Sequence, residues 1–198
     1  MSTKYYSGYK RHLLFLTFIL ASLSVSAQDK KNLYSDVPFK KGTKLASLAL
    51  GISIDNYYGQ IKPHPMPILI YDQGFFDNVG IGNIGLGGIA TCKFLRQKYP
   101  ASKYVAHTNN FYFGVRGTYH FTFLTKQNNN FDPYAGIMLG IKVSNTEDTY
   151  YQYKSGTATS LAKGIFIGAR YRLDDRFSAF SELGYNISFI SIGINVAL

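Results

Sequence analysis

The C-terminal stretch of the chain alternates strictly between apolar residues and small or polar ones, and this alternation constrains the fold more than any other feature. Successive side chains of a β-strand point to opposite faces, so a period of two predicts a strand. The apolar face is wholly aliphatic: Ile190, Ile192, Ile194, Val196 and Leu198. The opposite face is small or polar, which is the reverse of a water-soluble barrel filled with apolar side chains. The stretch therefore favours a transmembrane β-barrel.

Seven further segments show strand-like patterns of the same kind. The expected strands are 44–54, 66–73, 79–94, 111–123, 132–144, 162–173, 176–185 and 188–198. Tilted strands of about ten residues are long enough to span a bilayer. In 79–94 apolar residues occur at both parities, so the register of that strand stays open. We predict an all-β fold, an eight-stranded antiparallel up-and-down transmembrane barrel over residues 44–198, in which the last strand closes the ring against the first.

The connections between these strands predict an orientation. The segments 55–62, 95–110 and 145–160 are long, whereas the alternate turns at 74–78, 126–130 and 174–175 are short. Outer-membrane barrels have long loops outside the cell and short turns in the periplasm. Both termini are therefore expected in the periplasm. Pro63, Pro65 and Pro67 are expected at the beginning of the second strand, because proline cannot donate to a ladder.

The first 27 residues have the layout of a secretory signal peptide. Basic residues come first, an apolar run of about eleven residues follows at 13–23, and Val25, Ser26 and Ala27 form a small-residue cleavage site. A transmembrane helix would need about 20 apolar residues. Residues 28–43 are polar and are expected to be a flexible N-terminal segment. We expect an exported protein in the outer membrane of a Gram-negative bacterium.

Charge narrows the class of partner. Removal of the leader's three basic residues lowers the formal net charge from +10 to +7. A basic chain can bind nucleic acid, but this one has no Lys/Arg cluster longer than two residues and no helical recognition pattern. Anionic lipid headgroups are the better expected partner.

The expected register also sorts side chains between the inside and the outside. An eight-stranded barrel is just wide enough for inward side chains to fill it. The predicted polar cluster of the lumen is Arg116, His120, Lys142, Arg170, Arg172 and Glu182. Glu182 is predicted to pair with Arg170 or Arg116, because an unpaired charge there would be costly. The predicted lipid-facing residues are Ile137, Leu139, Ile141, Ile165, Ile167, Ile190, Ile192, Ile194 and Val196.

Candidate chemistry in the sequence is weak. His120, Thr122 and Glu182 supply a base, a hydroxyl and an acid, but such a spacing is common by chance. The histidines, His12, His64, His107 and His120, are scattered, so no metal site is expected. The glycine-rich 80–88 lacks the Lys-Ser/Thr pair and the helix of a phosphate loop, so no cofactor is expected. Cys92 stands alone and allows no internal disulfide. We expect no enzyme.

Several motifs, in order, carry a family resemblance over nearly the whole mature chain. They are Pro65-x-Pro67-Ile68, Tyr71-Asp72-Gln73-Gly74, Gly80-Ile81-Gly82, Gly114-Val115-Arg116, Tyr119-His120-Phe121, Asp132-Pro133-Tyr134-Ala135-Gly136, Gly168-Ala169-Arg170-Tyr171 and Phe180-Ser181-Glu182-Leu183-Gly184-Tyr185. Together they resemble the small outer-membrane β-barrel proteins, porin-like and of OmpA/OmpX size, of Bacteroidota-type bacteria. The resemblance implies the barrel and the outer membrane but no activity. Leu198 departs from the aromatic residue with which such barrels often end.

The expected function is therefore a structural or surface-interaction role in the outer membrane. The expected partners are outer-membrane lipid or lipopolysaccharide, the barrel-assembly machinery and an unidentified surface partner, with no nucleic acid. A narrow porin-like channel for small solutes is the alternative. More remote alternatives are a lipid-modifying barrel enzyme and a soluble, lipocalin-like barrel.

Overall fold

The computed structural model describes residues 38–57, 60–98, 105–125, 128–148, 153–154, 157–185 and 187–198. The expected signal peptide and the first part of the expected flexible segment, 28–37, lie outside these residues. The long strands are β1 (Lys44–Tyr57), β2 (Gln60–Val79), β3 (Gly82–Lys98), β4 (Val105–His120), β5 (Phe131–Asp148), β7 (Ala158–Arg172), β8 (Phe177–Tyr185) and β9 (Ile190–Ala197). A two-residue strand, β6 (Tyr153–Lys154), pairs with β5, and α2 (Thr122–Thr125) is a single helical turn. No helix in these ranges is long and apolar enough to cross a membrane.

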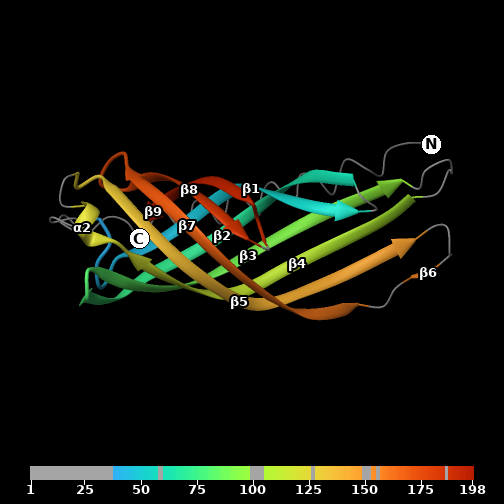
Figure 1. The fold of residues 1–198 in the computed structure, drawn as a ribbon, viewed down its shortest axis with the longest axis horizontal. Coiled ribbons are helices and arrows are strands. Elements are labelled where there is room, and N and C mark those ends of the chain that lie inside the picture. Colours follow the sequence, from blue (N-terminus) through green and yellow to red (C-terminus); the bar gives the residue numbers. More distant parts are fainter. Residues whose placement is uncertain are drawn as a thin grey trace, which may run out of the picture.

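The eight long strands form a closed antiparallel ring (Figure 1). Each long strand pairs with the long strands before and after it in the chain, and β9 pairs with β1 to close the circle. In that closing ladder Ser47 lies opposite Asn195 and Leu48 opposite Ile194. The predicted eight-stranded up-and-down barrel and its closing contact are both confirmed.

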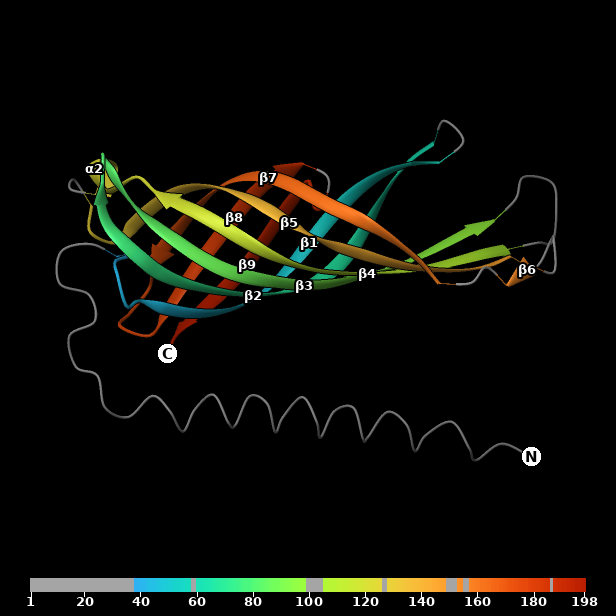
Figure 2. The same ribbon diagram turned by 90° about the horizontal axis from the view of Figure 1, so that it is seen from below.

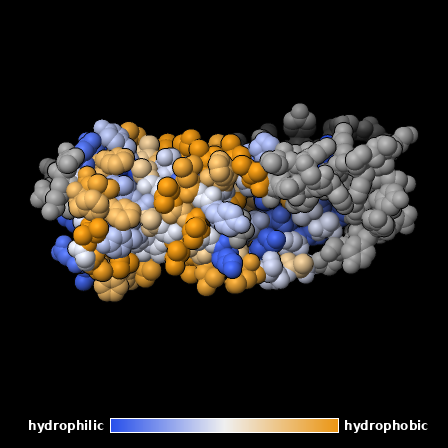
Figure 3. All heavy atoms as spheres, viewed as in Figure 1, coloured by the Kyte–Doolittle hydropathy of each residue, from blue (hydrophilic) through white to orange (hydrophobic). Residues whose placement is uncertain are grey.

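Alternation along the strands separates two faces of the wall. On β5, β7 and β9 the expected outward residues Ile137, Leu139, Ile141, Ile165, Ile167, Ile192 and Ile194 are 48–67% exposed. Ile190 and Val196 share this face but are half-buried. Residues between them, such as Met138, Arg170 and Asn195, are buried inside. Apolar side chains consequently cover much of the outer wall, visible as orange patches over the left and middle of the molecule in Figure 3.

Many exposed aromatic side chains lie near the two ends of this wall, while Phe113 of β4 and Tyr71 of β2 are exposed between these ends. The aromatic side chains at the end that holds the C-terminus and α2 are Phe75, Phe76, Phe123, Phe131, Tyr171 and Phe177. Those toward the other end are Phe94, Phe111, Tyr185 and Phe189. Phe94 and Phe111 contact each other edge to face, with ring centroids 6.3 Å apart. Two such belts are the usual arrangement on barrels that cross a bilayer.

The ring is closed over only part of its length. Pairing of β2 with β3 starts at Ile68, although β2 itself starts at Gln60. Pairing of β7 with β8 starts at Ile165, and pairing of β1 with β9 ends at Ile52. Beyond these pairs the wall divides into the β1–β2 hairpin and a sheet of β3, β4, β5 and β7, and Figure 2 shows the hairpin curving away from that sheet.

Three prolines lie inside β2 rather than before it, which corrects the expected start of the second strand at residue 66. Pro63, Pro65 and Pro67 pair with β1 and are exposed on the outer face. The carbonyl of Pro67 accepts a hydrogen bond from the Thr91 hydroxyl of β3, so the missing proline donors point toward β3. Because β2 and β3 are unpaired along this segment, the prolines interrupt no ladder bond.

Other boundaries also differ from the sequence prediction. Most of the expected loops 55–62, 95–110 and 145–160 is strand, and the parts between the strands lie largely outside the described ranges. The expected turn at 74–78 lies at Gly80 and Ile81, after β2 has continued through Val79. The expected fourth strand ends at His120 because α2 follows. The sequence prediction assumed strands just long enough to span a bilayer. The strands continue beyond the closed ring, and these extensions were therefore assigned to loops.

The open register of the third strand is settled by its pairing with β4. Gly85, Ile89 and Lys93 lie opposite inward residues, whereas Leu86 and Phe94 point outward. Apolar residues occur at both parities because this strand contributes isoleucine and leucine to the interior as well as to the outer wall. The interior of the barrel is therefore partly apolar.

Candidate functional site

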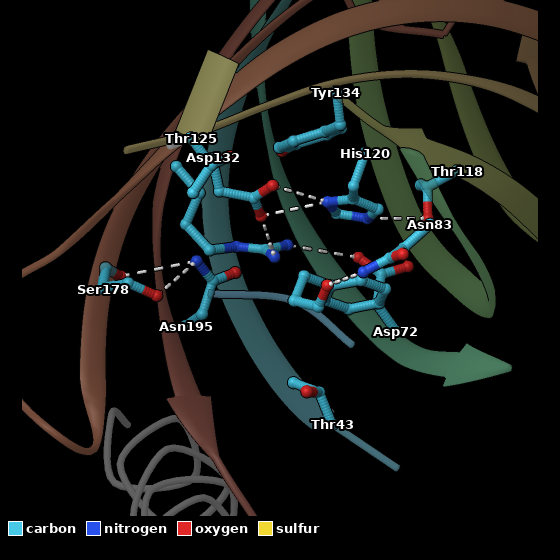
Figure 4. A network of polar contacts seen from close by, with 12 residues as sticks. Thr43, Asp72, Asn83, Thr118, His120, Thr125, Asp132, Tyr134, Ser178 and Asn195 are labelled. Atoms are coloured by element: carbon cyan, nitrogen blue, oxygen red, sulfur yellow. Dashed lines mark hydrogen bonds and ion pairs between the residues drawn. The ribbon is translucent and has the colours of Figure 1, made fainter. Parts of the chain in front are cut away.

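Charged side chains from five strands meet inside the closed part of the ring. This inner charge cluster consists of Asp72, Arg116, His120, Asp132, Tyr134, Arg170 and Glu182. They come from β2, β4, β5, β7 and β8, and every member is at most 7% exposed. Part of the network is drawn in Figure 4. Alternation places these residues inside because each shares its parity with buried neighbours on its own strand.

Arg116 lies at the centre of the cluster. Its Nη2 is 2.6 Å from Oε1 of Glu182, and its Nε is 3.1 Å from Oδ1 of Asp72. The Tyr134 hydroxyl donates to the same Glu182 oxygen over 2.9 Å. The guanidinium carbon also lies 4.2 Å from the centre of the Phe166 ring. The sequence predicted that Glu182 pairs with Arg116 or Arg170, and the structure contains the pair with Arg116.

Arg170 extends the network to a second pair of carboxylates. Its Nη1 donates to Oδ2 of Asp132 at 3.0 Å, and its Nη2 lies 3.7 Å from Oδ2 of Asp72. Asp72 therefore faces both arginines. Two guanidinium groups and three carboxylates are buried together, so each charge has an opposite charge beside it, which a low-dielectric interior requires.

His120 completes the cluster next to Asp132. Its Nδ1 lies 2.9 Å and 3.0 Å from the two Asp132 oxygens, so this nitrogen carries the proton that a carboxylate accepts. Its Nε2 lies 3.1 Å from the Thr118 hydroxyl, which can donate to it. A carboxylate, an imidazole and a hydroxyl in this order resemble a hydrolytic triad. His120 is 1% and Thr118 3% exposed, however, which leaves a substrate no access to them.

The sequence named Thr122 as the hydroxyl beside His120, and the structure separates the two. Thr122 lies in α2, where its hydroxyl donates to the carbonyl of Ile81 over 3.0 Å. Thr118, two residues before His120, takes the position next to the imidazole.

The segment just before β1 closes the barrel beneath His120. Phe39 is fully buried, and its ring stacks on His120 at 3.7 Å with an interplanar angle of 12°. The Asn83 side chain donates to the Phe39 carbonyl over 2.7 Å. Two backbone hydrogen bonds also join the strap of residues 38–43 to Gly74. The Gly42 N–H donates to the Gly74 carbonyl, and the Gly74 N–H donates to the Thr43 carbonyl. This differs from the flexible segment expected up to residue 43.

Gly74 shows why this strap can lie so close to the wall. A Cβ atom at this position would be 2.0 Å from the carbonyl oxygen of Lys40. Any other residue would therefore displace the strap. The glycine permits the backbone of residue 40 to rest directly on β2.

An apolar layer fills the lumen on the other side of the charge cluster. Its buried members are Ala49, Met66, Ile68, Ile70, Tyr112, Met138, Ala162, Phe180 and Ile187. Between this layer and Glu182 lies a cavity of about 30 Å³. A cavity needs roughly 10–15 Å³ to hold one water molecule, so this space fits a few waters and no larger solute.

Two predicted members of the lumen cluster have the inward parity but do not join the inner charge cluster. Arg172 binds the Asn130 side-chain oxygen through Nε at 3.1 Å and Nη2 at 3.0 Å, near the turn that precedes β5. Lys142 lies opposite Tyr112 of the apolar layer, away from the inner charge cluster. Among the described residues no group of three or more His, Cys, Asp and Glu is arranged to hold a metal ion.

Sequence reasoning missed Asp72, Asp132 and Phe39. Asp72 has the parity of Met66, Ile68 and Ile70, and Asp132 has the parity of Tyr134. That shared parity was the available signal for both carboxylates. Phe39 lies outside any strand, so no alternation could have placed it.

Comparisons with known proteins bear on the fold. No protein-family model and no curated protein matches the sequence. The neisserial surface protein A (NspA) structure superposes with a TM-score of 0.56 at 15% identity, covering 80% of this chain and 98% of that one. The attachment invasion locus protein Ail of Yersinia pestis, in complex with the heparin analogue sucrose octasulfate, gives 0.51 at 10% identity, covering 79% and 96%. At these identities the likeness shows a shared fold, the small antiparallel barrel.

Proposed function

We propose that this chain is a non-catalytic outer-membrane barrel protein with a structural or surface-interaction role, and not a pore. The filled interior is the observation that carries the proposal. Phe39, the layer of paired charges and the apolar layer follow one another along the lumen, in that order. An eight-stranded barrel has no room for a channel once its inward side chains are this large.

The outer wall supports a place in a membrane. Apolar side chains cover the closed ring, and exposed aromatics stand at both of its ends. Backbone groups without a ladder partner cost several kcal/mol each in hydrocarbon, so only the closed part of a barrel can lie there. The divided part of the wall, beyond Ile68 and Ile165, would then stand outside the bilayer.

Orientation and partners belong to the same proposal. The short turns and the C-terminus would lie in the periplasm, and the long extensions of β3, β4 and β5 at the cell surface of a Gram-negative, Bacteroidota-type bacterium. Insertion would require the barrel-assembly machinery. Ail was solved with a sulfated sugar, and the present chain has a formal net charge of +10, or +7 without the three basic residues of the expected leader. Lipopolysaccharide or another anionic surface partner suits that charge.

The alternatives are each opposed by one observation. A narrow channel conflicts with the buried charge cluster and apolar layer that occupy the inside of the closed ring. A lipid-modifying enzyme would need access to His120, which is 1% exposed and stacked against the buried Phe39 ring. A soluble lipocalin-like barrel would keep its bulky apolar residues inside, whereas Leu50 on the outer wall is 70% exposed.

Fractionation tests the membrane location. The full-length chain, expressed in a Gram-negative host, should sediment with the outer membrane and dissolve only in detergent. Recovery from the periplasm without detergent would contradict the proposal.

Cysteine labelling tests the orientation separately. In a Cys92→Ser background, a maleimide that cannot cross membranes should label Arg96→Cys on intact cells, since Arg96 is exposed near the end of β3. Asn130→Cys, in the turn before β5, should react only after the cells are opened. The opposite pattern would reverse the orientation and leave the membrane location standing.

A further inference from the structure

The outer face of β3, β4 and β5 changes its chemistry toward the end of the barrel that holds β6 (Figure 1). Outward residues that lie opposite one another form rows across these three strands. The last two apolar rows are Ala90, Phe113 and Ile141, followed by Cys92, Phe111 and Val143. The two rows beyond them, which we call the polar rim, are Phe94, Asn109 and Asn145, followed by Arg96, His107 and Glu147. The outer wall therefore passes from apolar to polar between two successive rows.

The two asparagines of the polar rim lie side by side. Asn109 is opposite Asn145 in the β4–β5 ladder, so their Cβ atoms are about 5 Å apart. Neither side-chain amide forms a hydrogen bond with another described residue. Their inward neighbours Thr108 and Thr146, by contrast, are joined to each other over 3.2 Å. Each amide presents an acceptor oxygen and a nitrogen with two donors, which match the hydroxyl groups of a sugar.

Arg96 is the cation of the polar rim. Its side chain is exposed, and among the described residues no carboxylate forms an ion pair with it. Glu147, the carboxylate of the polar rim, lies two strands away, which is about 10 Å at the usual strand spacing, and His107 lies between them. The planar guanidinium group carries N–H donors that match the oxygens of a phosphate. A phosphate beside Arg96 would therefore meet a positive charge at a distance from the carboxylate.

Phe94 adds an apolar surface to the same face. Its ring is 62% exposed, and the residue lies opposite Asn109 and two positions before Arg96. Phe111 contacts the Phe94 ring edge to face, which restricts the positions that the ring can adopt. Burial of this ring against the C–H groups of a sugar is favourable. The polar rim thus combines amide, guanidinium and aromatic groups on one exposed face.

We propose that the polar rim binds the phosphorylated sugar headgroup of a glycolipid in the outer leaflet. The phosphate contacts Arg96. Sugar hydroxyls bond to Asn109 and Asn145, and a sugar ring packs on Phe94. The acyl chains continue along the adjacent apolar rows, past Phe113, and this continuity favours a lipid over a free saccharide. The inference rests on the outer-membrane function proposed above and specifies the class of lipid and the face of the barrel that binds it.

Native mass spectrometry of the refolded full chain in detergent tests the site with lipid A, a glucosamine disaccharide that carries phosphates and acyl chains. Wild-type protein should bind lipid A more tightly than phosphatidylglycerol, which has a phosphate and acyl chains but no sugar ring. Arg96→Gln should lower the affinity for lipid A about tenfold, the effect of losing one hydrogen bond to a charged group. The same change should have little effect on lipid A from which the phosphates have been removed. Combined Asn109→Ala and Asn145→Ala should weaken the binding of both forms.

Two exposed positions provide matched controls. Lys44→Gln removes an outward cation at the opposite end of the barrel, and Thr159→Ala removes a polar group from the outer face of β7, opposite Val143. Neither change should alter the affinity for lipid A. Equal affinities of the wild type, Arg96→Gln and the double asparagine variant would overturn the site.

Two further ligands distinguish a glycolipid from other partners. The deacylated, phosphorylated disaccharide should bind much more weakly than lipid A, and equal binding would identify a free saccharide as the partner and overturn the lipid site. Equal binding of phosphatidylglycerol and lipid A by the wild type would reduce the contact to charge alone and would also overturn it. Failure of the wild-type chain to insert into membranes would instead overturn the proposed outer-membrane function.

Discussion

The Nη2 atom of Arg116 lies 2.6 Å from Oε1 of Glu182, so an ion pair joins β4 to β8 across the inside of the ring. The side chains are 1% and 8% exposed. Two strands that do not touch in the wall are thereby linked through the lumen. The pair is central to the closed interior, because Asp72 forms a second ion pair with Arg116 and the Tyr134 hydroxyl donates a hydrogen bond to Glu182.

Replacing Glu182 by Gln should destabilise the barrel. The neutral amide leaves the buried Arg116 charge facing Asp72 alone, and removing one partner of a buried pair costs about 3 kcal/mol at the low end of the usual range. Urea unfolding of the protein in lipid vesicles measures the loss. Glu147→Gln, at an exposed position on β5, should stay within about 0.5 kcal/mol of wild type. An equal effect of both changes would contradict the assigned role of the pair.

Removing the Phe39 ring should open the end of the barrel beneath His120. The ring is fully buried and stacks on the imidazole, so Phe39→Ala leaves a gap beside Thr118. In a Cys92→Ser background, a thiol at Thr118→Cys should react slowly with a small maleimide, and much faster once Phe39 is also Ala. Phe123→Ala removes an exposed ring at the same end and should not accelerate the reaction. Similar rates in all three proteins would show that Phe39 does not seal this end.

The prolines of β2 predict a position-dependent effect of proline substitution. Pro65→Val adds a donor that faces the unpaired side of β2, so stability should change by less than about 0.5 kcal/mol. Leu69→Pro removes a donor on the same side, four residues further on, where β2 is paired with Ala90 of β3. That change should cost about 3 kcal/mol. Urea midpoints in vesicles compare them, and equal costs would refute the proposed division of the wall.

The turn between β7 and β8 predicts a pH dependence. Hydrogen bonds from the backbone N–H groups of Phe177 and Arg176 to the exposed Asp174 carboxylate lower its pKa below the ordinary value of 3.8. A lowered pKa means that the carboxylate stabilises the folded turn above pH 3.8 and loses this contribution as the pH falls through the folded pKa. Asp174→Asn should remove that acid-sensitive part of stability. An NMR titration giving a pKa of 3.8 or higher for Asp174 would contradict the assignment.

The wall of the barrel could be predicted from the sequence because alternation is a local signal. Parity alone assigns Ile137 and Leu139 to one face of the strand and Met138 to the other. Two strands with such a pattern are enough to show which face points into the lumen. The prolines misled that reasoning. Pro63 and Pro65 suggested that the strand starts after them. The structure tolerates both prolines inside β2 because β2 has no pairing with β3 before Ile68, and the sequence does not show where that pairing begins.

The inner charge cluster could be predicted only in part for a similar reason. Parity predicted that Arg116, Arg170 and Glu182 point inward. It could not predict which of these charges form ion pairs, since that depends on the position of each residue along the axis of the tilted barrel. Lys142 has the right parity but lies level with Tyr112 of the apolar layer, away from the inner charge cluster. Phe39 enters the lumen from a segment without periodicity, held by Asn83 and Gly74. Contacts of this kind depend on the closed ring already being in place.

Conductance in a planar lipid bilayer tests the central claim most directly. The refolded full-length protein, inserted under voltage beside an open porin as the positive control, should produce no unitary current steps, because the charge cluster, the apolar layer and Phe39 fill the lumen. Reproducible steps from the wild-type protein would contradict a closed barrel and favour the narrow channel.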